Sequence, residues 1–305
     1  MKYEKIVLVG GNGYLGGVLA KYFSVITSEV VIISRKSAPN DKNIKTIVWD
    51  GKSEGDWENA LNGAELVVNL CGKNVNCRYN AKNKAEIISS RVVPTKLLGN
   101  AIQKSNNPPK LWINITSATI YRYAEDYPQD EIMGEIGAGF SIEVCKIWEE
   151  TFYNFTTPNT RKIALRMGIV LGKEDGVFPR LLNLVKLGMG GKQGDGQQYV
   201  SWIHEHDVAL SVDYLMNHTE LAGNINCTSP EPVKNAVLMK EIRTVYKMPF
   251  GLPAPTWLLK IGAIMIGTET ELILKSRWVM PTVLTNSGFK FKYGNLREAI
   301  KAILN

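Results

Sequence analysis

The sequence predicts an α/β fold in which a doubly wound parallel sheet is followed by a smaller C-terminal lobe. In the first half of the chain, short β-branched runs alternate with helical patterns, as they do in parallel βαβ units. Beyond Gly172 this alternation gives way to a glycine-rich loop at 188–196 and a proline-punctuated stretch at 249–255. No Ser-, Gly- or Pro-rich linker separates the halves, so we expect domains at 1–172 and 173–305 with interleaved packing.

The first half contains the expected sheet. Its β-branched, apolar runs predict strands at 5–9, 30–34, 46–49, 66–70, 111–115 and 162–166. Apolar residues at helical spacing predict helices over 14–23, 81–103 and 140–152. We expect the sheet to end near Leu171.

The second half is predicted to be mainly helical, with two further strands. Strands are expected at 199–203 and 224–227, and helices at 178–187, 205–216, 234–246 and 295–304. The apolar segment 257–267 contains Lys260 and is far shorter than the roughly 20 residues that cross a bilayer, so we expect a buried helix there.

Composition limits the class of protein. The 305 residues are 45% hydrophobic and 21% charged, with a formal net charge of +7. The basic residues are scattered, which favours an anionic small molecule over nucleic acid. Four cysteines without a CxxC pair, together with a first strand that leaves no room for a signal peptide, predict a protein of the reducing cytoplasm without a membrane or metal site. The sequence does not predict an oligomeric state.

A glycine turn follows the first expected strand. Gly10, Gly13 and Gly16 have the spacing GxxGxxG, a variant of the dinucleotide-binding fingerprint of Rossmann-type sheets. Such glycines let the backbone approach a pyrophosphate, whose charge then lies at the N-terminus of the next helix. The candidate cofactor contacts in this turn are Gly10, Asn12, Gly13, Tyr14, Leu15 and Gly16.

The end of the second strand indicates which dinucleotide binds. An NAD site usually has an acidic residue there, whereas this chain has Ser34 and Arg35, and no acid before Asp41. A guanidinium pairs with phosphate oxygens, so we predict NADP(H) as the cofactor, with Ser34 and Arg35 at its 2′-phosphate. The other interpretation is that Arg35 and Lys36 simply end a strand in solvent.

These pieces resemble the extended short-chain dehydrogenase/reductase superfamily, and in particular its epimerase-like subfamily with a C-terminal extension of its own. The resemblance covers essentially the whole chain. The motifs that carry it are Gly10–Gly16, Asn69–Gly72, Ser89–Arg91 with Thr95, Thr116–Tyr121, Trp148–Glu149, Arg166, Ser201–His204 with Asp207, and Gly288–Phe291.

The resemblance implies roles for further residues. Leu70, Cys71 and Gly72 are expected to lie against the cofactor, and Ser117 to hydrogen-bond the substrate oxygen that undergoes hydride chemistry. Asp50 matches a position that contacts the adenine amine, although Asp-Gly is also a common turn. Arg91 replaces a helix asparagine of the superfamily; it either reaches cofactor phosphate or pairs on the surface.

The chain lacks the Tyr-x-x-x-Lys pair with which the superfamily transfers protons. Aligning Glu149 with the usual glutamate puts Ser141 and Cys145 where the tyrosine and lysine should be, and neither does the same chemistry. The closer subfamily lacks the pair as well. Tyr121, which the superfamily also places beside the site, is the candidate acid/base residue, with Glu143 and Lys146 as alternatives.

A second departure concerns the substrate. Nucleotide-sugar enzymes of the superfamily often have a Gly-Asp-Gly loop followed by an arginine that binds the substrate diphosphate. Here Gly194-Asp195-Gly196 leads to Val200 at that position, which offers no charge. Arg122 replaces a glycine after Tyr121 and is expected to add a cation near the mouth of the site. The His204–Asp207 segment looks metal-like, but the resemblance gives it a structural role.

Two functions follow from these observations. The first is an NADP-dependent epimerase or oxidoreductase that transfers hydride to or from an unidentified small substrate, of which a molecule like a nucleotide sugar is one candidate. The second is a regulator that has lost its chemistry and signals NADP(H) state to a protein partner, as the missing Tyr/Lys pair suggests.

Overall fold

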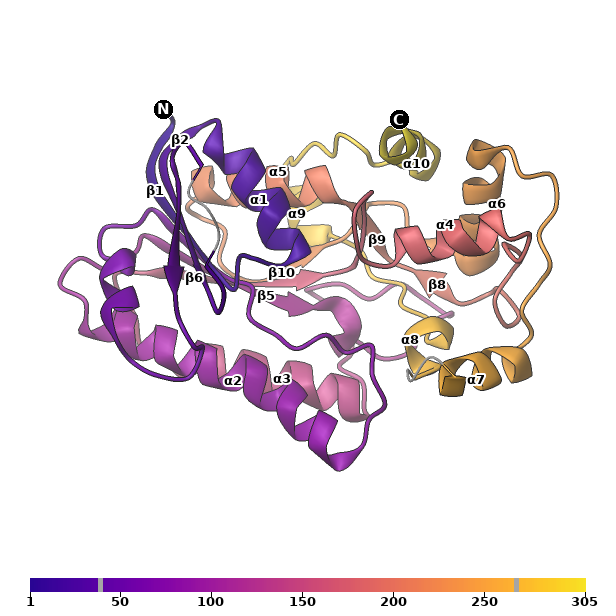
Figure 1. The fold of residues 1–305 in the computed structure, drawn as a ribbon, viewed down its shortest axis with the longest axis horizontal. Coiled ribbons are helices and arrows are strands. Elements are labelled where there is room, and N and C mark those ends of the chain that lie inside the picture. The colour runs from indigo at the N-terminus through magenta and orange to yellow at the C-terminus, as the bar shows by residue number, and fades with distance from the viewer. Residues whose placement is uncertain (38–40, 266–268) are drawn as a thin grey trace.

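A computed structural model describes residues 1–37, 41–265 and 269–305. Its centre is a seven-stranded sheet with the strand order β10-β6-β5-β4-β1-β2-β3 (Figure 1). Every pairing in this sheet is parallel. The strands are β1 (Tyr3–Val9), β2 (Thr27–Ser34), β3 (Ile44–Val48), β4 (Leu66–Asn69), β5 (Leu111–Ser117), β6 (Arg161–Met167) and β10 (Gly223–Cys227).

Helices cover both faces of the sheet, which makes it doubly wound (Figure 1). On one face, α1 (Tyr14–Ser24) and α5 (Glu205–Asn217) bury apolar side chains such as Phe23 and Val212 against the strands. On the other face, α2 (Ala81–Lys104) and α3 (Phe140–Tyr153) do the same, together with the short 3-10 helix η1 (Asp56–Leu61). Burial on both faces explains why inner strands such as β1 and β4 contain uninterrupted apolar runs.

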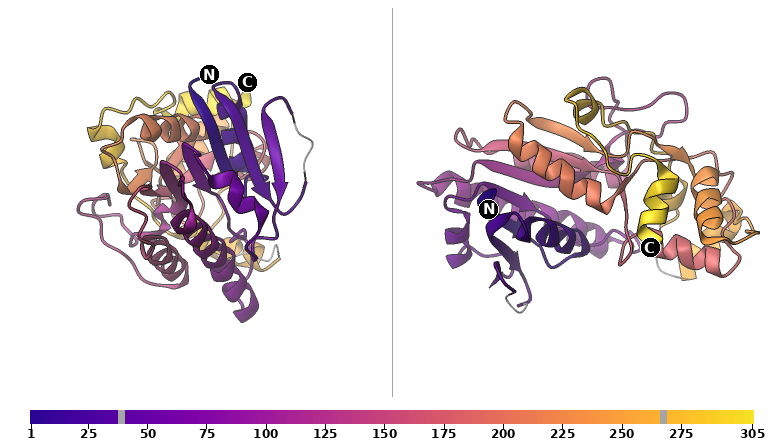
Figure 2. Two further views of the ribbon diagram at one scale, coloured as in Figure 1. Left: turned by 90° about the vertical axis from the view of Figure 1, so that its left-hand side faces the viewer. Right: turned by 90° about the horizontal axis from the view of Figure 1, so that it is seen from above.

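The second lobe has its own apolar core. Helices α4 (Phe178–Lys186), α6 (Asn235–Tyr246) and α10 (Leu296–Leu304) pack together at one end of the molecule (Figure 2). Two small sheets join this lobe: β7 (Ile169–Leu171) pairs with β9 (Trp202–His204), and β8 (Tyr199–Val200) pairs with β11 (Val233–Lys234). The remaining elements are the 3-10 helix η2 (Ala118–Ile120) and the helices α7 (Thr256–Met265), α8 (Glu271–Leu274) and α9 (Thr282–Asn286).

The predicted fold class is confirmed, whereas two details of the prediction are wrong. The sheet does not end near Leu171, because β10 pairs with β6 in parallel and α5 covers the same face as α1. The expected strand 199–203 is divided at Ser201 into β8 and β9, which belong to different sheets. The proposed division of the chain at residue 172 stays a prediction, and the central sheet crosses it.

The segment 257–267 differs from its prediction too. Its described part forms α7, but Trp257 is 64% exposed and Ile261 is 49% exposed, so the helix is not buried. Gly267 lies outside the described residues. Across the described ranges, no helix is both long and apolar enough to cross a membrane.

A stretch that we call the strap, residues 275–280, ties the two lobes together. The Ser201 hydroxyl donates to the carbonyl of Arg277 at 2.6 Å, and the backbone N–H of Arg277 donates to the Tyr199 carbonyl at 2.8 Å. The Ser276 hydroxyl donates to the Ala124 carbonyl at 2.6 Å, which lies in the segment after β5. Side-chain and backbone hydrogen bonds thus fix the strap between the sheet domain and the second lobe.

Candidate functional site

The glycine turn lies between β1 and the N-terminus of α1, and two of its glycines are required by packing. Gly10 has a φ of +77°, and a Cβ there would lie 3.0 Å from the Cys71 nitrogen. A Cβ at Gly16 would lie 2.2 Å from the carbonyl oxygen of Gly11, so α1 packs directly on the turn. A Cβ at Gly13 meets only one atom within 4 Å, the Gly10 oxygen at 3.9 Å. The backbone beside Gly13 is therefore open to a ligand.

Two other residues of the turn tie α1 to its surroundings. The Tyr14 hydroxyl donates a short hydrogen bond to the Glu205 carboxylate at the start of α5, and burial together with that carboxylate raises the tyrosine pKa. A Cβ at Gly172 would clash with the Tyr14 hydroxyl, at 1.6 Å. Leu15 packs against the core under α1. These side chains hold the N-terminus of α1 in position, and its backbone N–H groups remain the groups suited to a phosphate.

The end of β2 is shaped by hydrogen bonds to one carbonyl. The Asn12 amide donates to the Lys36 carbonyl at 2.9 Å, and the Ser34 hydroxyl donates to the same oxygen at 2.6 Å. Arg35 is exposed next to them and forms no salt bridge with any residue that the structure describes. Ser34 thus shapes the bend, while the guanidinium of Arg35 is available to a ligand.

The segment after β4 borders the turn. The Cys71 N–H donates to the Asn69 side chain at 3.1 Å, and burial raises the pKa of its thiol to about 12. Gly72 faces the Arg91 guanidinium, since a Cβ there would lie 3.2 Å from its central carbon. The structure therefore brings Leu70, Cys71 and Gly72 next to Gly10 and Arg91.

The Asp50 carboxylate closes a turn. It accepts hydrogen bonds from the N–H groups of Lys52 and Ser53 at 2.7 and 2.9 Å, and from the Ser53 hydroxyl at 2.7 Å. These hydrogen bonds lower the pKa of this exposed carboxyl. The turn interpretation accounts for both of its oxygens, and contact with an adenine is not needed to explain the residue.

A cavity of about 120 Å³ lies where α2, α3 and the end of β5 meet. The side chain of Arg91 forms part of its wall; the guanidinium donates to the carbonyls of Ile87 and Lys73 at 2.9 and 3.2 Å and stacks over the Trp148 ring at 5.0 Å. Arg91 is thus inside the site instead of paired on the surface. The lining residues are Val75, Tyr79, Ile87, Arg91, Ser117, Thr119, Phe140, Ser141, Val144, Cys145 and Trp148.

Ser117 ends β5 and caps η2. Its hydroxyl accepts from the Thr119 N–H at 3.2 Å, which directs the Ser117 side chain toward the carboxyl end of the sheet. Because it lines the cavity with Arg91, the structure brings these two predicted site residues together. A hydroxyl in this position is able to donate a hydrogen bond to a substrate oxygen.

The substitutes for the Tyr/Lys pair also line this cavity. Ser141 and Cys145 are one helical turn apart on α3, and both lie in the wall. Burial raises the pKa of the Cys145 thiol to about 12, so the group is neutral near pH 7. Glu143 and Lys146 form an ion pair at 3.5 Å on the solvent side of the helix, outside the described lining. The Glu143–Lys146 pair is therefore poorly placed for proton transfer.

Tyr121 lies in a buried polar cluster instead of in the described cavity wall. Its hydroxyl donates to the Asn226 side chain at 3.1 Å and accepts from Arg166 at 2.9 Å. Arg166 in turn binds both oxygens of Glu149 at 2.9 and 2.7 Å. Burial raises the pKa of Tyr121. The structure thus does not bring Tyr121 together with Ser117 at the cavity.

The cation that Arg122 was expected to add near the mouth of the site is paired within its own loop. Its guanidinium binds both carboxylate oxygens of Asp126, at 3.0 and 2.9 Å, and lies 3.2 Å from Glu135. It also stacks over the Tyr127 ring at 4.5 Å. Two carboxylates compensate the charge, so Arg122 fastens the loop after η2.

Sequence reasoning missed three residues beside the cavity. Tyr79 and Thr119 line it, and the Arg277 side chain donates to the Thr119 hydroxyl at 3.2 Å. Arg277 belongs to the strap, which is more than 150 residues from Thr119 in the sequence. No local spacing signals such a contact; the chain fold alone brings these residues together.

The His204–Asp207 segment is structural, as predicted. The His204 ring accepts the N–H of His206 at 3.0 Å, and Asp207 accepts the N–H groups of Lys292 and Tyr293 at 2.8 and 2.9 Å. It therefore anchors the chain that leads into α10. No group of three or more metal-ligating side chains occurs among the residues described.

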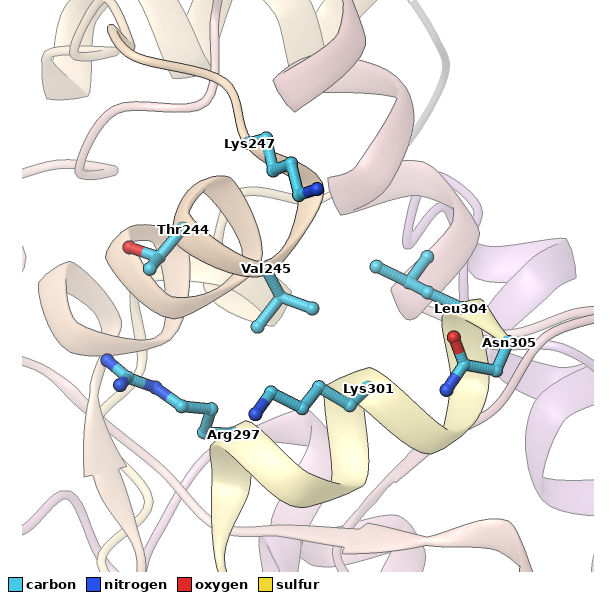
Figure 3. Close-up of a pocket in the computed structure, with 7 residues that line it drawn as sticks. All are labelled: Thr244, Val245, Lys247, Arg297, Lys301, Leu304 and Asn305. Carbon is cyan, nitrogen blue, oxygen red and sulfur yellow. The ribbon is translucent and has the colours of Figure 1, made fainter.

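A second hollow, of about 390 Å³, lies between α6 and α10 (Figure 3). Its lining includes Lys247, Arg297 and Lys301, and Arg297 is paired with Glu241 at 2.7 Å. None of the predicted site residues lines it. Of the predicted site residues, Ser117 and Arg91 line the smaller cavity at the end of β5 instead.

The strand order, the glycine turn at its switch point and the open backbone at Gly13 define a dinucleotide-binding α/β protein. The chain belongs to the NAD-dependent epimerase/dehydratase family, whose model matches residues 6–227. A domain of unknown function, DUF1731, matches residues 254–303, which include the strap. The predicted C-terminal extension of the subfamily is thereby confirmed.

Relatives share the whole architecture. The epimerase family protein YfhF of Bacillus subtilis is 29% identical over 300 residues, which cover 98% of this chain and 97% of YfhF. The human epimerase family protein SDR39U1, solved with NADPH, has a TM-score of 0.84 and 25% identity, covering 98% of each chain. Bordetella bronchiseptica WbmG, solved with NAD, has a TM-score of 0.77 and 17% identity, covering 98% of this chain and 92% of that one. At that identity the likeness to WbmG shows the fold alone.

Proposed function

We propose that this protein binds NADP(H) and catalyses hydride transfer to or from a small substrate held in the cavity beside Ser117. The observation that carries the proposal is the adjacency of two features. The segment Leu70–Gly72 contacts the glycine turn on one side, and on the other side Gly72 meets Arg91, which lines the cavity together with Ser117. The dinucleotide cradle thus leads directly into the substrate cavity.

The residues present fit such a cofactor. The open backbone at Gly13 and the N–H groups at the start of α1 suit a pyrophosphate, and the exposed Arg35 suits a 2′-phosphate. The NADPH-bound human relative supports the choice of NADP(H). The cofactor supplies the hydride acceptor or donor, and the protein supplies position and electrostatics.

Within this proposal, Ser117 holds the substrate oxygen whose carbon exchanges hydride. Its hydroxyl donates a hydrogen bond to that oxygen, stabilising the charge that develops there. The Cys145 thiol is neutral and the Ser141 hydroxyl is a weak acid, so neither supplies the charge of the missing lysine. The positive charge of the missing lysine is supplied instead by Arg91, which lines the cavity from α2 and not from α3.

Cofactor preference is tested by Arg35→Asp. The substitution replaces a cation that pairs with a phosphate by an anion that repels it, so we expect NADPH affinity to fall about tenfold or more while NADH affinity rises relative to it. Nicotinamide fluorescence titrations measure both constants. Lys36→Asp is the matched control on the neighbouring exposed residue. An unchanged preference in Arg35→Asp would show that Arg35 has no part in cofactor choice.

Hydride transfer is tested by absorbance at the nicotinamide band across a panel of small carbonyl and hydroxyl compounds. Where turnover is found, Ser117→Ala should lower it by about 10²–10³-fold, the range seen when one transition-state hydrogen-bond donor is removed. Ser117→Thr keeps the hydroxyl and should retain much of the activity. Equal rates in the wild type and Ser117→Ala would contradict the role given to Ser117.

The regulatory function is the second candidate, and one observation favours it. Ser141 and Cys145 replace the catalytic pair, and Tyr121 is withdrawn into a buried cluster. A protein of this kind binds NADPH tightly and converts no compound of the panel. Turnover at roughly 1 s⁻¹ or faster, a rate ordinary for enzymes, would exclude it.

A further inference from the structure

The substrate side of the cavity is strongly basic. Arg91 lines the cavity, and Arg277 binds its lining residue Thr119 at 3.2 Å. Lys275 is the third cation; its side chain is only 9% exposed and lies 3.6 Å from Glu271. We call Arg91, Lys275 and Arg277 the cation cluster.

All three cations act electrostatically on one lining residue, Cys145. Burial raises the pKa of Cys145, and Arg91, Arg277 and Lys275 each act in the opposite direction on that same thiol. Burial lowers the pKa of each member of the cluster, and the positive charge of Arg277 lowers that of Lys275 further. Arg91 in the cavity wall and Arg277 next to the lining residue Thr119 are therefore close enough to act on a ligand in the cavity, and Lys275 lies two residues from Arg277 in the strap.

The cluster has an incomplete set of counter-ions within the described residues. Glu271 acts on Lys275 and Arg277, while Glu149, the carboxylate that acts on Cys145, is bound to Arg166 at 2.7 Å. Three cations and one carboxylate, that of Glu271, leave an excess of positive charge around a partly desolvated space. Such an arrangement is costly unless an anion completes it.

The strap fixes two of these cations before any ligand arrives. Hydrogen bonds from Ser201 and to Tyr199 hold the backbone of Arg277, and Trp278 stacks on the Tyr199 ring with centroids 4.1 Å apart. Ser276 binds the Ala124 carbonyl. A pre-positioned guanidinium loses little freedom when it binds a carboxylate or phosphate.

The position expected to hold a diphosphate is, by contrast, apolar. Val200 is buried in the core of the second lobe with Trp202 and Leu238. The cavity of about 120 Å³ is also well below the roughly 300–1,000 Å³ of pockets that enclose larger ligands. Both observations disfavour a nucleotide sugar and favour a compact molecule.

We propose that the cation cluster binds a carboxylate or phosphate group of a compact anionic substrate, placing the rest of that molecule beside Ser117. This inference rests on the proposed function, since it names the substrate class of the same cavity. Arg277 is the specificity-determining residue, with a bidentate guanidinium, and Lys275 adds charge. Substrates would be small acids or phosphorylated compounds without a nucleotide.

The test is calorimetric titration of the NADPH-loaded protein in a buffer free of carboxylate and phosphate. The probes are malonate and inorganic phosphate, with neutral malonamide as the uncharged counterpart of malonate and UDP as the nucleotide probe. We expect at least one of the two anions to bind, malonamide not to bind, and UDP to bind no better than phosphate.

Variants assign the binding to the cluster. Arg277→Gln should lower the affinity for the anion at least tenfold, as expected for the loss of a charge-assisted pair. Lys275→Gln should lower this affinity less. Arg277→Lys should retain part of the affinity, and the exposed Lys96→Gln on α2 should retain all of it. If circular dichroism shows that Arg277→Gln is unfolded, the anion affinities of Lys275→Gln and Arg277→Lys test the role of the cluster instead.

Several results would overturn the inference: absence of anion binding, equal binding of malonamide, preference for UDP, or unchanged affinity in folded Arg277→Gln. NADPH binding is followed separately by its fluorescence, and the titrations are repeated without NADPH. Anion binding in a protein that does not bind NADPH would refute the proposed function alone. NADPH binding without anion binding would refute this inference alone.

Discussion

The glycine turn and helix α3 belong to one site but follow its family pattern to different degrees. The turn keeps the GxxGxxG spacing, and a Cβ at its Gly10 or Gly16 would lie 3.0 or 2.2 Å from the backbone of the protein itself. Helix α3 has Ser141 and Cys145 at the positions of the Tyr/Lys pair. The glycine turn thus depends on backbone geometry, whereas the cavity wall at α3 depends on which side chains are present.

A buried cluster of paired polar side chains lies next to α3. Arg166 donates hydrogen bonds to Glu149 of α3 and to the hydroxyl of Tyr121, which follows η2. The two charged groups of this cluster, Arg166 and Glu149, are thus paired with each other. The cation cluster beside the cavity has three positive charges and fewer carboxylates. The difference separates a polar network that stabilises the fold from one suited to binding a ligand.

The largest effect on stability is expected from Glu149→Ala. Removal of this carboxylate leaves the buried Arg166 guanidinium without its partner, which costs about 3–5 kcal/mol in the free energy of unfolding. Glu150→Ala, on the exposed side of the same helix, should cost far less. Urea denaturation measures both. Similar losses in the two variants would show that the buried pair is not what stabilises the substrate side.

The second-largest loss of stability is expected from Gly16→Ala. The added methyl group meets the Gly11 carbonyl, so α1 has to shift, and we expect a loss of about 1–3 kcal/mol together with weaker NADPH binding. Gly17→Ala is the matched control, because a Cβ there meets nothing within 4 Å and the residue is exposed. It should stabilise the helix slightly, by up to about 1 kcal/mol. Unimpaired NADPH binding by Gly16→Ala would contradict the packing role of this glycine.

A smaller, pH-dependent effect is expected at His204. Burial lowers its pKa from 6.5 to about 4, so the native state holds the ring neutral. This contribution to stability is complete above pH 6.5, where the unfolded histidine is neutral too, and it is lost as the pH falls from 6.5 toward 4 because only the unfolded ring takes up a proton.

The His204→Asn variant keeps an acceptor for the His206 N–H and does not titrate. Unfolding measured from pH 8 to pH 4 should therefore show a shallower acid decline than in the wild type, by roughly 1–3 kcal/mol over that range. Parallel pH profiles of the two proteins would show that His204 has no such role.

The fold and the cofactor side were predictable because local patterns determine them. The spacing of Gly10, Gly13 and Gly16 and the apolar strands identify the sheet, and the expected helix over 81–103 is α2, Ala81–Lys104. Ser117, expected beside the substrate, and Arg91, expected either at a cofactor phosphate or on the surface, line one cavity. The residue that these patterns misplaced, relative to the cavity, is Tyr121, whose partners Asn226 and Arg166 are far away in sequence.

Other features depend on contacts that a sequence pattern does not contain. The apolar composition of α7 indicated burial, yet hydropathy does not state whether a neighbouring surface exists, and Trp257 is 64% exposed. The carboxylate partner of Arg122 was four residues away at Asp126, a spacing that is informative only once the loop conformation is known. The cation cluster joins α2 to the strap and has no sequence signature at all.

The strap also bears on how the protein is made. Synthesis from the N-terminus delivers β1 to β6 and their helices long before residues 275–280 leave the ribosome, whereas Ser201, Tyr199 and Ala124 need that stretch as their hydrogen-bond partner. The nascent chain therefore contains the glycine turn and all of its neighbours in the sheet before it contains Lys275 and Arg277, whose stretch completes the hydrogen bonds of these earlier residues.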